Sequence, residues 1–174
     1  MNNIKVGDNM KIGYEIYEST VIGPIGIVVS DKGLERLMLF EEDLNDYLKE
    51  NPQIKVDKVL CKEVKEQLHQ YFRGERKQFE IKLSVQGTPF RQRVWDSLQA
   101  IPYGETISYS QLAYNIENPK AIRAVGGANR ANKIPIIIPC HRVIGKNGAM
   151  VGFAGDKIDT KIKLLQHEQL YATG

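Results

Sequence analysis

One cysteine of the chain stands beside groups that could activate it. Cys140 follows Pro139 and is followed directly by His141 and Arg142. A thiol is nucleophilic as its thiolate, and a neighbouring cation or proton acceptor favours that form. The tetrapeptide therefore indicates nucleophilic chemistry at sulfur. The alternative is an inert, buried cysteine that packs as a small apolar residue.

An apolar segment, residues 134–138, must position this cysteine. Its isoleucines predict a buried strand or extended segment. Pro139 disfavours the α conformation at Ile138, so we expect Cys140 at a fixed, partly exposed turn toward a helix.

The composition is typical of a globular protein. The 174 residues are 42% hydrophobic and 26% charged, which excludes disordered and fibrous classes. No apolar run approaches the roughly 18 residues of a membrane span, and the first residues lack a secretory signal pattern. We therefore expect an intracellular protein, cytoplasmic or nucleoid-associated, or nuclear in a eukaryote. Its two cysteines, Cys61 and Cys140, are expected to be free thiols.

Charge changes sign along the chain. Residues 1–86 hold 13 Lys and Arg against 15 Asp and Glu, whereas residues 87–174 hold 11 against 6. At the border, Thr88 and Pro89 are the signals of a helix start. We predict a structural N-terminal αβ domain over 1–86 and a C-terminal domain over 87–174 that carries the chemistry. The positive half could bind an anionic partner, or it could simply present a solvated basic face.

The first half is rich in strand patterns. Residues 14–19, 25–29 and 33–40 predict a small antiparallel sheet, and residues 78–85 alternate as a further strand would. Helices are predicted over 41–51 and 58–72. Cys61 and His69 lie too far apart on the second helix for one metal site. No residue of this half indicates chemistry.

The second half predicts mainly helices. One helix spans 89–100, with Trp95 on its apolar face. A pair over 108–116 and 119–131 has the length and short connection of a helix-turn-helix. The second helix of this pair carries three basic residues, namely Lys120, Arg123 and Arg130.

Two glycines inside that second helix, Gly126 and Gly127, each cost about 1 kcal/mol relative to alanine. Close approach by another surface would explain them, and DNA could be that surface. The same helix pair is also an ordinary packing unit.

Beyond the cysteine, residues 145–148 predict a turn and residues 152–155 a loop that could close over a bound group. A final helix begins with Asp159 or Thr160 as its cap and carries Glu168 near its end. Its anchoring residues are predicted to be Ile162, Leu164, Leu165 and Leu170.

Several stretches of the second half, taken in order, resemble the O6-alkylguanine-DNA alkyltransferases, also called methylated-DNA–protein-cysteine methyltransferases. They are residues 87–90 with 93–95, 101–104 with 107–109, 123–126 through 130–132, and 138–143. The resemblance runs from about residue 87 to about residue 168. It implies an α+β fold, with a ribonuclease H-like N-terminal domain and a mainly α, winged-helix-like C-terminal domain containing the helix-turn-helix. The first half fits that family only in length and strand content.

The resemblance implies a suicidal DNA repair reaction. A methyl or other alkyl group would pass from O6-alkylguanine in duplex DNA to Cys140 after base flipping, with O4-alkylthymine as a further candidate substrate. His141 would take the thiol proton through a water, and Glu168 would orient His141. Tyr109 would donate to the departing guanine, and Asn132 would brace the cysteine turn. Because a thioether does not hydrolyse under mild conditions, each molecule would act once, without a cofactor.

The resemblance also implies a minor-groove DNA surface on the second helix of the pair. Arg123 would insert into the duplex in place of the flipped nucleotide. The small residues around it would let the helix lie close to DNA. The residues assigned to this surface are Lys120, Arg123, Ala124, Gly126, Gly127 and Arg130.

The substrate pocket implied by the resemblance includes Pro139, Val143, Phe153, Ala154 and Gly155. The Ala154 N–H would point at the guanine oxygen. This chain departs from the family at Phe153, where tyrosine is usual, and at Asp156, where glycine is frequent.

Two other functions remain open from the residues. A lesion-binding module without chemistry is disfavoured by Cys140, which the family's non-catalytic relatives lack. A cysteine hydrolase using Cys140 and His141 would need no DNA. We expect double-stranded DNA containing alkylated guanine as partner, and a monomeric protein. We expect no structural metal, because residues 1–86 hold too few cysteines and histidines for the family's zinc site.

Overall fold

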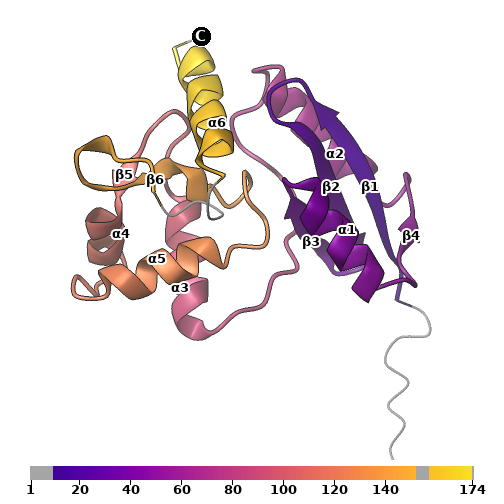
Figure 1. Cartoon of the computed structure of the whole chain (residues 1–174), viewed down its shortest axis with the longest axis horizontal. Helices are drawn as coiled ribbons and strands as arrows, with labels where there is room; N and C mark the ends of the chain where they lie inside the picture. The colour runs from indigo at the N-terminus through magenta and orange to yellow at the C-terminus, as the bar shows by residue number, and fades with distance from the viewer. Residues whose placement is uncertain (1–9, 152–156, 174) are drawn as a thin grey trace, which may run out of the picture.

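The computed structural model describes residues 10–151 and 157–173. A half built on a twisted sheet lies beside a half built mainly of helices (Figure 1). One apolar core runs through both, from Ile27 of the sheet to Leu164 of the last helix. The predicted α+β class is confirmed. None of the described helices is long and apolar enough to cross a membrane.

The N-terminal sheet has the strand order β3-β2-β1-β4. Strands β1 (Ile12–Ser19), β2 (Gly23–Ser30) and β3 (Gly33–Met38) are antiparallel neighbours, which confirms the predicted antiparallel sheet. The short β4 (Lys55–Val56) adds a parallel edge to β1. Two residues are too few to give a periodic signal, so the sequence did not predict β4.

The strand predicted over 78–85 is wrong. Only Leu83 pairs, through a single parallel bridge to Leu34. The amide side chain of Gln67 accepts from the backbone N–H of Glu80 at 2.9 Å and donates to its carbonyl at 3.1 Å. These side-chain bonds satisfy backbone groups that a strand would have paired in a ladder.

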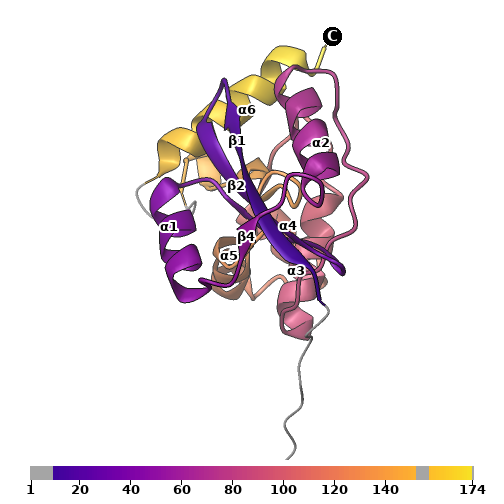
Figure 2. The same cartoon turned by 90° about the vertical axis from the view of Figure 1, so that its right-hand side faces the viewer.

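Two helices pack against this sheet, and they flank its strands in Figure 2. Helix α1 (Glu41–Glu50) buries Leu44 against Val28 and Met38 on one face. Helix α2 (Lys62–Phe72) joins the main core on the other. It begins four residues later than predicted, because the Asp57 carboxylate accepts from the N–H of Leu60 and forms a separate turn.

Helices dominate the second half. They are α3 (Pro89–Gln99), α4 (Tyr109–Asn115), α5 (Ile122–Arg130) and α6 (Ile158–Tyr171). The parallel pair β5 (Ile107–Ser108) and β6 (Val143–Ile144) joins the start of α4 to the chain after the cysteine. Thr88 caps α3 as predicted, and buried Trp95 donates to the carbonyl of Ala128 in α5 at 2.9 Å. This bond ties the helix-turn-helix to the core.

Helix α5 starts three residues later than predicted, so Lys120 lies in the turn before the helix and not on it. The N–H of Ala121 donates to the carbonyl of Asn118, which closes a turn around Pro119. Glu117 adopts a positive φ of 61° just before that turn. Pro119 therefore belongs to the connection and does not open the helix.

Helix α6 differs from the prediction in its cap and in one of its anchoring residues. It begins at Ile158 without a side-chain cap, so neither Asp159 nor Thr160 has that role. Leu170 is 70% exposed and does not anchor the helix, whereas Leu164 is fully buried. Lys161 is also fully buried, a placement that helical periodicity alone would not predict for a charged residue.

The segment before the cysteine is buried as predicted, but it is not extended. Residues 134–138 form a tight coil in which the N–H of Ile138 donates to the carbonyl of Ile134 at 3.0 Å. Ile136 adopts a positive φ of 75°, a rare conformation for a β-branched residue. The coil leads into the short 3-10 helix η1 (Cys140–Arg142).

Candidate active site

Cys140 lies at the start of η1 and is only 4% exposed, so the predicted partial exposure is wrong. Burial raises the pKa of its thiol to about 11, against opposing contributions from the Asn132 amide and the Lys161 ammonium. At neutral pH the sulfur is therefore mainly a thiol. A base is needed to make it a nucleophile.

Asn132 holds the coil that carries the cysteine. Its Nδ2 donates to the carbonyl of Ile138 at 2.7 Å, and its Oδ1 accepts from the N–H of Ile134 at 2.9 Å. One side chain thus joins both ends of residues 134–138. This geometry fits the bracing position that the resemblance implied for Asn132.

His141 and Glu168 form a fully buried pair, with His141 Nε2 and Glu168 Oε2 2.8 Å apart. Burial lowers the pKa of His141, although the Glu168 carboxylate opposes this. The imidazole is therefore neutral at pH 7. Because a neutral imidazole carries one proton and the carboxylate only accepts, that proton lies on Nε2.

The other nitrogen of His141, Nδ1, is buried and has no hydrogen-bond partner among residues 10–151 and 157–173. Its lone pair is the basic position of the ring in this tautomer. His141 is thus oriented by one nitrogen and able to accept a proton at the other.

Arg142 binds the same carboxylate as His141. Its Nε donates to Glu168 Oε1 at 2.8 Å and its Nη2 to Oε2 at 3.0 Å, while Nη1 donates to the carbonyl of Ile101. Burial alone would raise the pKa of Glu168, but His141 and Arg142 outweigh it and hold that pKa well below the usual range. The carboxylate stays ionised and fixed in orientation.

Lys161 supplies the positive charge that counteracts the rise in the pKa of the Cys140 thiol. The sequence did not single out this residue. Its Nζ donates to the carbonyl of Val151 at 3.0 Å and to that of Val143. Burial lowers its pKa to about 8, against the opposing effect of Cys140. At neutral pH the ammonium form therefore favours the thiolate of Cys140.

Tyr109, at the first turn of α4, also reaches this region. Its hydroxyl donates to the carbonyl of Val151 at 3.0 Å, the same carbonyl that accepts from Lys161. Burial raises the Tyr109 pKa, and Cys140 adds to that rise. The hydroxyl is a neutral donor at physiological pH.

Asn129 on α5 was not assigned to the site from the sequence. It is 1% exposed, and its Nδ2 donates to the carbonyl of Cys140 at 3.4 Å. Its Oδ1 has no partner within the described part of the chain. Periodicity alone places this residue on the buried face of α5, but it gives no sign of the contact with Cys140.

The other predicted pocket residues divide into two groups. Pro139 and Val143 are buried next to the cysteine turn, and the carbonyl of Val143 accepts from Lys161. Phe153, Ala154 and Gly155 lie outside the described residues, as does Asp156.

The predicted DNA surface is outward-facing on α5. Arg123, Ala124 and Arg130 are exposed, as is Lys120 in the preceding turn. A Cβ added at Gly126 or Gly127 would meet no described atom within 4 Å. Packing inside the protein therefore does not demand these glycines, and a small, basic helix face is left for an external partner.

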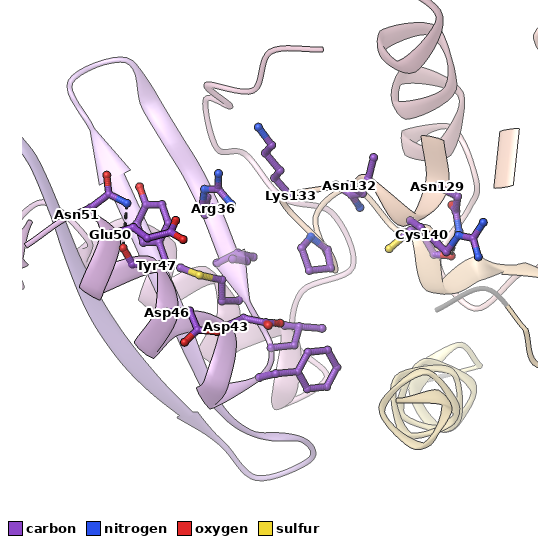
Figure 3. Close-up of a pocket in the computed structure, with 17 residues that line it drawn as sticks. Arg36, Asp43, Asp46, Tyr47, Glu50, Asn51, Asn129, Asn132, Lys133 and Cys140 are labelled. Atoms are coloured by element: carbon purple, nitrogen blue, oxygen red, sulfur yellow. Dashed lines mark hydrogen bonds between the residues drawn. The ribbon is translucent and has the colours of Figure 1, made fainter. Parts of the chain in front are cut away.

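A cavity of about 670 Å³ extends from Cys140 to the N-terminal half. Asn129 and Cys140 lie at one end, and Asp43, Asp46 and Tyr47 of α1 lie at the other (Figure 3). The first half, to which the sequence assigned no chemistry, thus forms part of the surroundings of the thiol. It also contacts Glu168 directly, because the Tyr71 hydroxyl of α2 donates to Oε2 at 2.6 Å.

Comparison with known proteins shows that two family models match this chain. The model of the 6-O-methylguanine DNA methyltransferase DNA-binding domain matches residues 89–170, and that of the ribonuclease-like domain of the same proteins matches residues 12–85. The chain belongs to the 6-O-methylguanine DNA methyltransferase family. The predicted family is confirmed, and it extends over the first half as well.

Two relatives within this methyltransferase family match the chain over nearly their whole length. The constitutive methylated-DNA–protein-cysteine methyltransferase of Bacillus subtilis strain 168 is 45% identical over 161 residues, which cover 91% of this chain and 97% of the relative. That of Methanosarcina acetivorans is 44% identical, with 89% and 97% covered. Mycobacterium tuberculosis O6-methylguanine methyltransferase superposes with a TM-score of 0.83 at 38% identity, over 92% of this chain and 94% of that chain. A structure of M. tuberculosis OGT in complex with DNA gives 0.81 at 39%, over 91% and 94%.

Proposed function

We propose that this chain repairs DNA by moving a methyl or other alkyl group from O6-alkylguanine in a duplex to the sulfur of Cys140. The observation that carries the proposal is the buried thiol beside a neutral histidine, His141, whose Nε2 is held by Glu168 and whose Nδ1 is unpartnered among the described residues. Family membership supports the same reaction.

The steps balance without a cofactor. His141 Nδ1 takes the thiol proton, through a bridging water, and the Lys161 ammonium stabilises the thiolate as it forms. The sulfur then attacks the alkyl carbon, the bond from carbon to the guanine oxygen breaks, and its electron pair leaves with the purine. The Tyr109 hydroxyl, which donates to the carbonyl of Val151 in this structure, turns to donate a hydrogen bond to that leaving group. The guanine anion takes up a proton from solvent as His141 releases its own. The product thioether is stable, so each molecule acts once.

Recognition of DNA is assigned to the exposed face of α5. Arg123 fills the place of the flipped nucleotide, and Gly126 and Gly127 allow the helix backbone to lie close to the minor groove. Arg130 and Lys120 contact phosphates, which position the protein without reading sequence. We propose a monomer that acts on alkylated guanine with little dependence on neighbouring bases.

Intact-protein mass spectrometry after incubation with a duplex carrying one O6-methylguanine tests the proposal. The wild type is expected to gain the mass of one methyl group, and the same duplex with unmodified guanine should give no gain. Cys140→Ser should gain nothing. Cys61→Ser is the matched control, because it removes the other buried thiol and should still be methylated. A gain that survives Cys140→Ser would refute the assignment.

The rival functions give different results in the same assay. A lesion-binding module would bind the methylated duplex tightly and leave the mass unchanged. A cysteine hydrolase would turn over an activated ester repeatedly without DNA.

A further inference from the structure

Tyr71 joins the N-terminal half to the carboxylate that orients His141. It lies on α2, and its hydroxyl donates to Glu168 Oε2 at 2.6 Å across 97 residues of sequence. Tyr71 is 0% exposed and Glu168 is 1% exposed. A hydrogen bond this short, made to a buried charged group, is among the stronger hydrogen bonds in proteins.

The position of Tyr71 is fixed by a second link to α6. His167, the neighbour of Glu168, has its Nε2 2.8 Å from the backbone carbonyl of Tyr71. The Tyr71 ring also packs edge-on against Phe72 at 4.9 Å and against Tyr103 at 6.1 Å between centroids. Backbone and ring are therefore both held, and the hydroxyl has one defined direction.

The contact affects His141 because several donors compete for the negative charge on Oε2 of Glu168. The same oxygen accepts from Tyr71, from His141 Nε2 and from Arg142 Nη2. Each donor draws on that charge, so the Tyr71 hydroxyl weakens the attraction between the carboxylate and a protonated imidazole. It also keeps the carboxylate turned toward His141.

We propose that Tyr71 is a positioning residue for the transfer reaction, through which the N-terminal half orients Glu168 and keeps His141 neutral and able to accept a proton. The inference rests on the proposed function of the Cys140 site and extends it to a residue outside the C-terminal half. Tyr71 acts through Glu168 and does not touch the reacting atoms.

Several other charged or titratable groups face His141 and must be accounted for. Within the described residues they are Glu168 and Lys161 from α6, and Arg142 from η1. Arg142 and Lys161 oppose protonation of His141, whereas Glu168 favours it. Substituting Tyr71 leaves all three in place, so a change in the His141 pKa reports on the shared carboxylate.

The test compares Tyr71→Phe with Tyr103→Phe. Both remove one hydroxyl from the same aromatic cluster, but the Tyr103 hydroxyl has no hydrogen-bond partner in the described part of the chain. Two quantities are measured as a function of pH: the single-turnover rate of methyl transfer, and the His141 pKa from NMR of labelled histidine. In Tyr71→Phe the His141 pKa should rise, because the carboxylate regains charge. The acid limb of the rate profile should move to higher pH, and the rate at pH 6 should fall about three- to tenfold. Tyr103→Phe should match the wild type in both.

A second variant keeps the outcome decisive if Tyr71→Phe folds poorly. Fluorotyrosine placed at position 71 keeps the ring and makes the hydroxyl a stronger donor, so the His141 pKa should move in the opposite direction. An unchanged His141 pKa in both variants would overturn the inference, even if transfer is slower. The NMR titration does not depend on transfer, so a wild type that accepts no methyl group would count against the proposed function alone.

Discussion

The two cysteines of this chain are almost equally buried, yet their charged neighbours act on the thiol pKa in opposite directions. Cys61, just before α2, is 0% exposed, and its sulfur lies 3.8 Å from the carbonyl of Gly13. Burial raises its pKa to about 12, and the carboxylates of Glu15 and Asp57 add to the rise. The pKa of Cys140 is raised only to about 11, because Asn132 and Lys161 oppose the effect of burial.

The difference shows that burial alone does not separate a reactive thiol from an inert one. What separates them is whether neighbouring groups stabilise negative charge on sulfur. Around Cys61 the carboxylates of Glu15 and Asp57 disfavour a thiolate and outweigh the backbone hydrogen bond from Val29 that favours it. Around Cys140 the neighbours are an amide N–H donor and an ammonium, with a neutral histidine next in sequence. The difference between the two cysteines can be tested by removing the favourable neighbours of Cys140 one at a time.

Asn132→Ala should have the largest effect. It removes the two bonds that close the coil before Cys140. The buried N–H of Ile134 loses its partner, and the carbonyl of Ile138 keeps only the backbone N–H of Cys140. We expect the free energy of unfolding to fall by about 1–3 kcal/mol and methyl transfer to slow sharply. Urea denaturation and single-turnover assays measure the two.

Asn51→Ala is the matched control for this variant. Its amide also donates to a carbonyl, that of Tyr47, but at an accessible helix end. It should cost less than about 1 kcal/mol and leave transfer unchanged. Equal losses in the two variants would show that Asn132 has no special place beside the thiol.

Lys161→Met should have the next largest effect. The substitution keeps the length of the side chain and removes the charge that favours the thiolate. A rise of one unit in the Cys140 pKa means about tenfold less thiolate, so we expect transfer near pH 7 to slow about tenfold.

The control for Lys161→Met is Lys163→Met on the same helix. Lys163 is solvent-accessible and pairs with Asp159 at 3.1 Å, so its loss should leave the rate within about twofold. The deficit of Lys161→Met should also shrink above pH 8, where Lys161 itself loses its proton. A deficit that is constant with pH would mean that the charge is not its cause.

The sequence predicted the chemistry of the site better than its geometry. The motif around Cys140 and the Glu168 position identify residues that lie together, and helical periodicity located α3 and α5 to within a few residues. The coil before the cysteine was missed, because buried isoleucines give the same apolar signal in a strand and in a coil pinned by Asn132. Lys161 and Tyr71 were missed for another reason. Their partners lie far away in sequence, and a charged or aromatic residue on a helix face carries no mark of such a contact.

The smallest predicted effect concerns stability at high pH and tests both cysteines together. A thiol whose pKa is raised by folding stabilises the folded state fully below its ordinary pKa of 9.0, and that contribution is lost as pH rises above it. The unfolded chain releases the proton first, so the free energy of unfolding should decline between pH 9 and pH 10.5. Cys61→Ser should make this decline shallower in urea titrations.

Cys140→Ser should also make the decline shallower, but by less than Cys61→Ser, because folding raises the pKa of Cys140 to about 11 and that of Cys61 to about 12. Lys161 has a lowered pKa, so its own contribution increases with pH between about 8 and its ordinary value of 10.5. At pH 8 Cys140 is a neutral thiol, so its removal should leave the onset of the Lys161 contribution in place. Both profiles should therefore differ from wild type only above about pH 9, with the larger difference in Cys61→Ser. If the two variants differ from wild type by the same amount, Asn132 and Lys161 do not offset the burial of Cys140, and the contrast between the two cysteines reduces to burial.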